Sequence, residues 1–127
     1  MSLTREQIAE RLQTKNTWLT GTRTDIFGAV VPERKVRYIV GIWLNGDGVA
    51  SRTVDIEKLE EDGTTYTMKW QGIPVAPTER VPVPPNWHFD LENPSMTLEG
   101  GARLYGKTGA PAGISVNSTT EYWDSDI

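Results

Sequence analysis

The single histidine of the chain lies in a segment whose residue types could support proton transfer. His88 and Asp90 are two positions apart in Trp87-His88-Phe89-Asp90, and a strand there would place both polar side chains on one face. A carboxylate beside an imidazole orients a histidine that acts as a general base. The nucleophile would have to be a serine or threonine from elsewhere, since the chain has no GxSxG motif. His88 and Asp90 are therefore candidate catalytic residues of a small hydrolase or isomerase, although a lone histidine among aromatic residues is more often structural.

Composition leaves little room for metal or thiol chemistry. The chain has no cysteine and one histidine, which excludes disulfides, thiolate ligands, cysteine nucleophiles and any site that needs two histidines. Asp47, in Asn45-Gly46-Asp47-Gly48, could offer a carboxylate to a calcium ion. The distal glutamate of an EF-hand is missing, however, and the segment is typical of a hairpin turn. We expect no metal and no cofactor, with Asp47 as the one candidate ligand.

One segment matches the phosphate-loop pattern only in its letters. Residues 101–108 satisfy G-x-x-x-x-G-K-[ST], but such a loop needs a strand before it and a helix after it, so that backbone amides face the phosphates. Leu104 and Tyr105 are typical of a strand, and the glycines and proline after Thr108 do not favour a helix. We interpret the match as chance and do not expect nucleotide hydrolysis.

Tryptophan is the more informative residue type, with five copies in 127 residues. A tryptophan ring can stack on a sugar or a base, or anchor a protein partner. Its N–H also allows the ring to lie partly buried at the protein surface, with the N–H hydrogen-bonded to water. Trp43 and Trp70 lie on strong strands, where we expect them to be buried. The candidates for a partner-binding or ligand-binding surface lie closer to element ends and are Trp18, Trp87, Trp123, Tyr105 and Tyr122. The alternative is that these rings fill the ends of a small barrel.

The charge distribution does not favour nucleic acid as a partner. Lys and Arg number 13 against 17 Asp and Glu, for a net charge of −4, with the excess of acid in the second half of the chain. Duplex binding needs a basic surface that neutralises several phosphates, and the one local cluster is Arg34, Lys35 and Arg37. The first residues lack the apolar region of a signal peptide, and the sequence contains no stretch of about 20 apolar residues. We expect a soluble protein that is cytoplasmic or virion-associated.

Length and periodicity predict one domain over residues 1–127, with a short helix followed by a β core over about residues 17–123. The helix is expected at about residues 5–15, because Thr4 and Gln7 form a capping box and Ile8 and Leu12 share a face. Its apolar stripe is narrow, so the helix must pack on another surface.

The strongest strand is expected over residues 36–44. Its alternation predicts that Val36, Tyr38, Val40, Ile42 and Leu44 share one face. Apolar residues also lie on the opposite face, so we expect the strand to be central in a sheet.

The residue pattern in the middle of the chain predicts a β-hairpin followed by a segment at the edge of a sheet. Residues 50–59 and 64–71 alternate around an acidic turn that ends in Gly63, which is typical of antiparallel strands. Five of the eight prolines fall in residues 74–85, and proline cannot donate to a β ladder. We expect residues 74–85 to form an edge segment or an extended crossing loop.

The last third of the chain returns to strand patterning. Residues 95–99 and 102–105 flank Gly100-Gly101, which predicts a two-residue hairpin. Residues 106–113 are expected to form a loop, residues 114–123 a final strand and residues 124–127 a frayed tail.

About eight short strands and one helix favour a small antiparallel β-barrel or sandwich. Because no convincing catalytic set is present, our first functional hypothesis is a non-enzymatic structural or assembly subunit that acts as a homo-oligomer, for example in a virion, coat or cage. The alternative hypotheses are a ligand-binding barrel for a small apolar molecule or a carbohydrate, and the small hydrolase or isomerase described above. The amount of apolar sequence also suggests a thin core that neighbouring copies help to complete.

Overall fold

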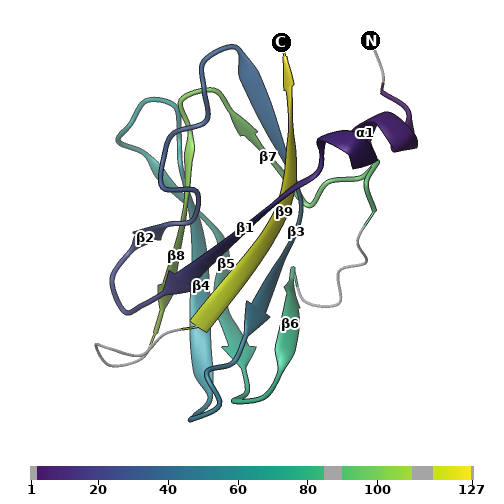
Figure 1. Ribbon diagram of the computed structural model, residues 1–127. Helices are drawn as coiled ribbons and strands as arrows, with labels where there is room; N and C mark the ends of the chain where they lie inside the picture. Colours follow the sequence, from purple (N-terminus) through teal and green to yellow (C-terminus); the bar gives the residue numbers. More distant parts are fainter. Residues whose placement is uncertain (1–2, 85–89, 110–115, 127) are drawn as a thin grey trace.

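Nine strands and one short helix make up the part of the chain that the computed structural model describes, which is residues 3–84, 90–109 and 116–126. These elements are α1 (Arg5–Arg11), β1 (Gln13–Leu19), β2 (Thr24–Asp25), β3 (Lys35–Asn45), β4 (Arg52–Leu59), β5 (Tyr66–Val75), β6 (Arg80–Val83), β7 (Met96–Glu99), β8 (Arg103–Thr108) and β9 (Val116–Asp126). The strands form two antiparallel sheets (Figure 1). The expected mostly β fold is confirmed in its sandwich form, because the two sheets do not join into a closed barrel.

The five-stranded sheet, sheet A, is built on β3. Its strand order is β1-β9-β3-β6, and β7 also pairs with β3. One edge of β3 is paired with β9, whereas the other edge is shared, with β7 beside residues 36–39 and β6 beside residues 42–45. Sheet B has the order β2-β8-β4-β5. The expectation of a central strand near residues 36–44 is thereby confirmed, and β6 confirms the expectation of an edge within the proline-rich segment.

The main core fills the space between the sheets. It includes Leu19 from β1, Ile42 from β3, Ile56 from β4 and Leu104 from β8, all fully buried. The chain has an accessible surface of 6874 Å², close to the roughly 6,800 Å² that scaling gives for a compact monomer of this mass. The described core is built from residues of both sheets of this chain. A contribution of neighbouring copies to the core stays a prediction.

A bulge in β3 changes which of its residues face the core. The alternation of the sequence predicts that Tyr38 and Val40 share a face with Ile42, and this is wrong. The register of β3 against β9 shifts between Ile39 and Gly41, which makes Val40 an extra residue in the strand. Ile39 and Ile42 consequently both belong to the core between the sheets, whereas Tyr38 and Val40 lie on the outer face of sheet A.

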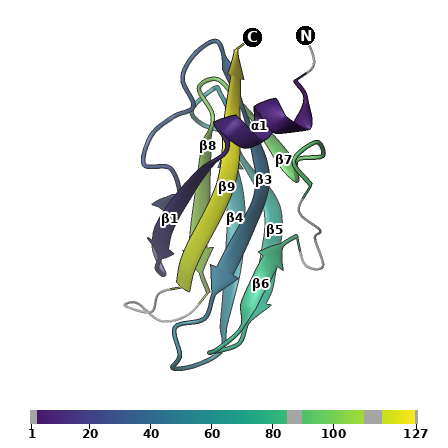
Figure 2. The same cartoon turned by 45° about the vertical axis from the view of Figure 1, so that its right-hand side comes forward.

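Helix α1 covers part of that outer face (Figure 2). Its expected capping box is present, since Thr4 Oγ1 accepts from Gln7 N–H and Gln7 Oε1 accepts from Thr4 N–H. The helix ends at Arg11, four residues earlier than expected, because Leu12 is extended and residues 13–15 already pair with β9 in β1. Tertiary strand pairing here outweighs a weak helical pattern.

A second, smaller core lies between α1 and sheet A. Ile8 packs there with Val40 and Trp123, and Tyr38 stacks on Trp123 with ring centroids 4.5 Å apart. Leu3, Leu12 and Leu91 close the edges of this cluster. The narrow apolar stripe of the helix thus has a partner within the same chain.

The chain passes from sheet A to sheet B at Gly100 and Gly101. The sequence predicts a two-residue hairpin here, and this is wrong: β7 pairs with β3 in sheet A, whereas β8 pairs with β2 and β4 in sheet B. The turn is held by a third segment, since Gly101 N–H donates to the carbonyl of Val31 at 2.8 Å. Lys58 Nζ of β4 lies 2.5 Å from Glu99 Oε2 of β7 and joins the two sheets close to this turn.

Strands β8 and β9 both extend beyond their expected ends. Residues 106–108 belong to β8 rather than to a loop, and residues 124–126 belong to β9 rather than to a frayed tail. Of the rest of the expected loop, Gly109 donates its N–H to the carbonyl of Thr53 at 2.9 Å, and residues 110–113 lie outside the described residues. Pairing with β4 orders the first segment, and pairing with residues 35–37 of β3 orders the second.

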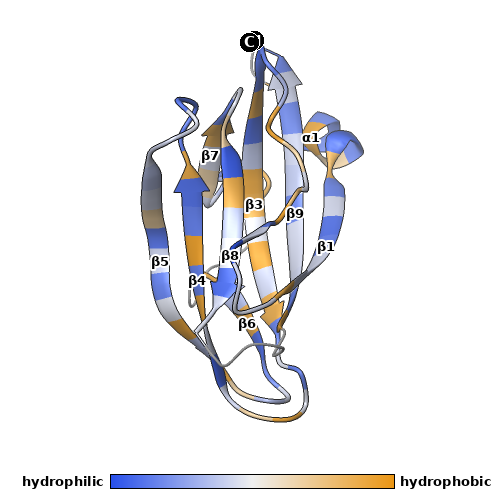
Figure 3. Cartoon of the chain, turned by 90° about the vertical axis from the view of Figure 1, so that its left-hand side faces the viewer, coloured by the Kyte–Doolittle hydropathy of each residue, from blue (hydrophilic) through white to orange (hydrophobic). Residues whose placement is uncertain are grey.

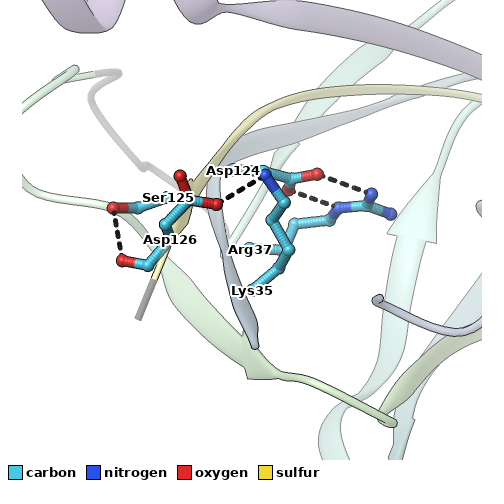
Figure 4. A network of polar contacts seen from close by, with 5 residues as sticks. All are labelled: Lys35, Arg37, Asp124, Ser125 and Asp126. Carbon is cyan, nitrogen blue, oxygen red and sulfur yellow. Dashed lines mark hydrogen bonds and ion pairs between the residues drawn. The ribbon is translucent and has the colours of Figure 1, made fainter. Parts of the chain in front are cut away.

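Two ion pairs hold the end of β9 against the start of β3 (Figure 4). Arg37 donates from Nε and Nη2 to the two carboxylate oxygens of Asp124 at 2.7 and 2.9 Å, and both side chains are largely buried. The Arg37 guanidinium also lies over the Tyr122 ring, 4.6 Å from its centroid. Lys35 and Asp126 pair at 2.6 Å, but these two side chains are 40% and 79% exposed.

Asp124→Ala should lower the free energy of unfolding by about 2–3 kcal/mol, because it leaves the buried Arg37 guanidinium without its counter-charge. Asp126→Ala is the matched control at the same strand end, and it should cost less than about 1 kcal/mol because its pair is exposed. Urea unfolding followed by tryptophan fluorescence measures both. Equal effects of the two substitutions would contradict the assigned difference in burial.

Candidate interaction surface

The outer face of sheet B gathers tyrosine, arginine and methionine side chains. We call this surface the tyrosine–arginine face, and its residues are Arg23, Asp25, Glu57, Tyr66, Met68, Arg103 and Tyr105. Helix α1 lies on the other sheet (Figure 3). In the part of the chain that the structure describes, no helix packs on this face.

Strand alternation explains how sheet B presents these side chains. Val54 and Ile56 of β4 point into the core, so Glu57 next to Ile56 lies on the outer side, opposite Tyr105 of β8. Leu104 points inward in the same way. Apolar and polar bands accordingly alternate along β4 and β8 in Figure 3.

The turn between β4 and β5 places Tyr66 on this face. The expected hairpin is confirmed, with Leu59 opposite Tyr66. The Asp62 carboxylate accepts hydrogen bonds from Thr64 N–H at 2.8 Å, Thr65 N–H at 2.8 Å and Thr65 Oγ1 at 2.6 Å. These bonds, the one from the Thr65 hydroxyl first, stabilise the charged carboxylate and lower the pKa of Asp62 from 3.8 to about 2.

Arg23 connects the loop before β2 to the middle of the face. Its Nη2 donates to Glu57 Oε2 at 3.0 Å, and its guanidinium lies 3.8 Å from the centroid of the Tyr66 ring. The hydrogen bond to Glu57 is the main cause that raises the pKa of Arg23. The cation is thus already paired and stacked within the chain.

A second arginine on this face, Arg103, is also paired with a carboxylate. Arg103 Nη1 donates to Asp25 Oδ2 at 2.7 Å, and this bond raises the pKa of Arg103. The rings of Tyr66 and Tyr105 lie 5.8 Å apart at an interplanar angle of 51°. Burial, and then the negative charge of Asp25, raise the pKa of Tyr105, so its hydroxyl stays neutral and able to donate.

The face combines accessible apolar surface with balanced charge. Tyr66 and Met68 are 41% and 43% exposed, which places them among the few large exposed hydrophobic side chains of the described residues. The same face carries two cations and two anions, paired as described above. The surface can therefore bury apolar area without leaving an unpaired charge.

The structure separates the five aromatic residues that the sequence proposes as a binding surface. Tyr105 lies on the tyrosine–arginine face, and Trp18 is 58% exposed on the outer face of sheet A. Tyr122 points toward the main core and contacts Phe27 edge-on at 4.7 Å. Trp123 is 8% exposed beneath α1. The fifth residue, Trp87, lies outside the described residues.

Two of the candidate catalytic and metal-binding residues, Asp47 and Asp90, make local hydrogen bonds. Asp47 accepts from Val49 N–H at 2.8 Å and pairs with Arg52 at 3.2 Å. Asp90 accepts from the backbone N–H of Glu92 at 2.9 Å, while His88 lies outside the described residues. Among the residues that the structure places, no group of three acids or histidines could hold a metal ion. Catalysis by His88 and Asp90 stays an untested prediction.

The phosphate-loop pattern has a structural explanation. Its second glycine, Gly106, lies inside β8, where a Cβ atom would come within 2.7 Å of Leu19 Cδ1. The glycine therefore allows β1 to approach β8 closely. Thr108 ends the strand, so the chain at this position does not form the loop that phosphate binding requires.

Sequence patterns alone did not single out Arg23, Tyr66 and Met68. The alternation of β5 suggests that Tyr66 and Met68 share a face with Trp70. The register of β5 against β4 is irregular at this point, and Trp70 packs on the main core while Tyr66 and Met68 stay outside. The available signal for this surface was that Tyr66 and Met68 alternate with polar residues along the second strand of the predicted hairpin.

Comparison with known proteins gives no match, whether to a family model, a curated protein or a solved structure. Within the described residues, no helix is both long enough and apolar enough to cross a membrane.

The stability that Asp62 gives to the turn should depend on pH. Its pKa is lowered in the folded state, so its contribution is fully present above pH 4 and is lost as the pH falls through about 2. The difference in unfolding free energy between wild type and Asp62→Asn should therefore shrink toward zero as the pH falls over this interval. Thr65→Val should reproduce part of the effect, since it removes the hydroxyl bond. Thermal unfolding at a series of pH values measures both, and a difference that stays constant with pH would contradict the assignment.

Proposed function

We propose that this protein is a non-enzymatic assembly subunit that associates with a second copy of itself through the tyrosine–arginine face. The observation that carries this proposal is the exposed pair Tyr66 and Met68 beside two pre-paired arginines on an outer sheet face. A role of this kind includes a structural component of a virion, coat or cage, as the sequence also suggested.

The composition of the face is that of a protein–protein contact. Tyrosine, methionine and arginine are the side chains enriched in interfaces, and tyrosine and arginine dominate binding hot spots. Tyr66 and Tyr105 have few rotatable bonds, and Arg23 already lies over the Tyr66 ring. The side chains lose little further freedom on binding, which supports association.

The charge pattern favours a second copy as the partner. Arg23 and Arg103 alternate with Glu57 and Asp25 across the face, so the surface carries both signs at short spacing. Two copies related by a two-fold axis can place each cation near an anion of the other copy. A strongly acidic or basic partner would meet like charge on the same surface.

The closed core supports association between folded subunits. The accessible surface of 6874 Å² is that of a compact monomer, and α1 is packed on its own sheet. Self-association is therefore expected to be reversible and concentration-dependent, without unfolding of the subunit.

Sedimentation velocity from micromolar to millimolar concentration should show a monomer in equilibrium with a dimer. Met68→Glu places an unpaired charge in the contact and should weaken the dimer at least about tenfold. Trp18→Ala removes an exposed aromatic side chain from the other sheet and should leave the equilibrium unchanged.

Two outcomes would refute the proposal. One is a wild-type protein that stays monomeric over the whole concentration range, and the other is a dimer that tolerates Met68→Glu. Circular dichroism of the variant shows whether it is folded, and Tyr66→Ala provides a second test at the same surface.

A further inference from the structure

Trp18 is the most exposed aromatic side chain among the described residues, and the tyrosine–arginine face does not include it. It lies on β1 at the outer face of sheet A, since its neighbour Leu19 is fully buried in the main core. Helix α1 covers a different part of this face, over Val40 and Trp123. With 58% of its surface exposed, the Trp18 ring is accessible for stacking on a ligand.

Strand register aligns polar side chains with Trp18 across the whole sheet. Trp18 pairs with Asn117 of β9, Asn117 pairs with Asn45 of β3, and Asn45 pairs with Arg80 of β6. The four residues form what we call the Trp18 row, which spans three inter-strand spacings, or roughly 14 Å. All four lie on the outer side, because their strand neighbours belong to the main core or pack against it, namely Leu19, Val116, Leu44 and Val81.

The row offers hydrogen-bonding groups that are not tightly bound to each other. Asn45 Nδ2 lies 3.5 Å from both the carbonyl oxygen and Oδ1 of Asn117, at the outer limit for a hydrogen bond. The Arg80 guanidinium lies over the Trp43 ring, 4.8 Å from its centroid, which holds the cation at the far end of the row. Carboxamides and a guanidinium can each contact two adjacent ligand oxygens.

We propose that the Trp18 row binds a carbohydrate chain made of pyranose rings. The negative face of an indole ring attracts the C–H face of a sugar, and the two carboxamides can bridge neighbouring hydroxyl groups. A row of roughly 14 Å is longer than one sugar ring, so the ligand is an oligosaccharide rather than a monosaccharide.

Charge makes carbohydrate a better ligand than single-stranded nucleic acid, which also stacks on tryptophan. A nucleic-acid groove follows the phosphate backbone with several cations, whereas Arg80 is the one cation of this row. The chain as a whole carries a net charge of −4. Neutral polyhydroxylated ligands do not need the missing positive charge.

The test uses isothermal titration with a panel of hexasaccharides, namely those of chitin, cellulose, xylan and starch, and with a thymidine oligonucleotide as the competing ligand class. We expect at least one hexasaccharide to bind, Trp18→Ala to weaken that binding at least about tenfold, and Asn45→Ala to weaken it as well. The oligonucleotide should not bind.

Met68→Glu is the matched control, because it changes the opposite sheet and should leave sugar binding unchanged. Binding of no hexasaccharide would overturn the proposal, as would binding that Trp18→Ala does not affect or binding of the oligonucleotide instead. The inference uses none of the residues of the proposed dimer contact, so either proposal can fail without the other.

Discussion

The pairing of β3 on both of its edges is the constraint on which the two outer faces depend. β9 occupies one edge, and β6 and β7 divide the other. A slip of one residue in such a strand would turn every side chain to the opposite face. The bulge at Val40 introduces one such shift within the strand. As a result Ile39 and Ile42 both face the core, and Val40 packs against α1. The same shift places Trp43 and Asn45 on the outer face, so the Trp18 row also depends on it.

Local signals predicted the parts of the fold that depend on nearby residues. The capping box at Thr4 and the hairpin of β4 and β5 are confirmed, because the hydrogen bonds of the cap and of the turn join residues three to five positions apart. The end of α1, the bulge at Val40 and the crossing at Gly100 were missed. Each is set by a partner far along the chain: β9 for the first two, and the segment at Val31 for the third.

For the candidate surfaces, too, the sequence indicates the residue types, but contacts with distant residues decide where those residues lie. Trp18 and Trp123 look alike in the sequence, near the ends of strand-like segments, yet one is 58% exposed and the other 8%. The difference comes from α1, which packs on only one of them. Arg23 and Glu57 are 34 positions apart, so no spacing pattern shows that they meet. Residue type indicated which rings could bind, and only the sheet order shows which of them can be reached.

The two proposed surfaces lie on opposite sheets, and this arrangement has a consequence for binding strength. A dimer formed through the tyrosine–arginine faces would bury sheet B of each copy and leave both copies of the Trp18 row on the outside, facing away from each other. A single row with one stacking ring can give only weak affinity, because even a nucleobase stacked on an aromatic side chain gains only roughly 1–3 kcal/mol. Linked sites gain affinity only where the geometry lets both bind at once. The two rows of one dimer can therefore act together only on ligands that reach both sides of the dimer, such as neighbouring glycans of a dense surface. A short oligosaccharide should therefore bind the monomer and the dimer equally well, whereas a glycan-coated surface should retain the dimer more strongly than Met68→Glu.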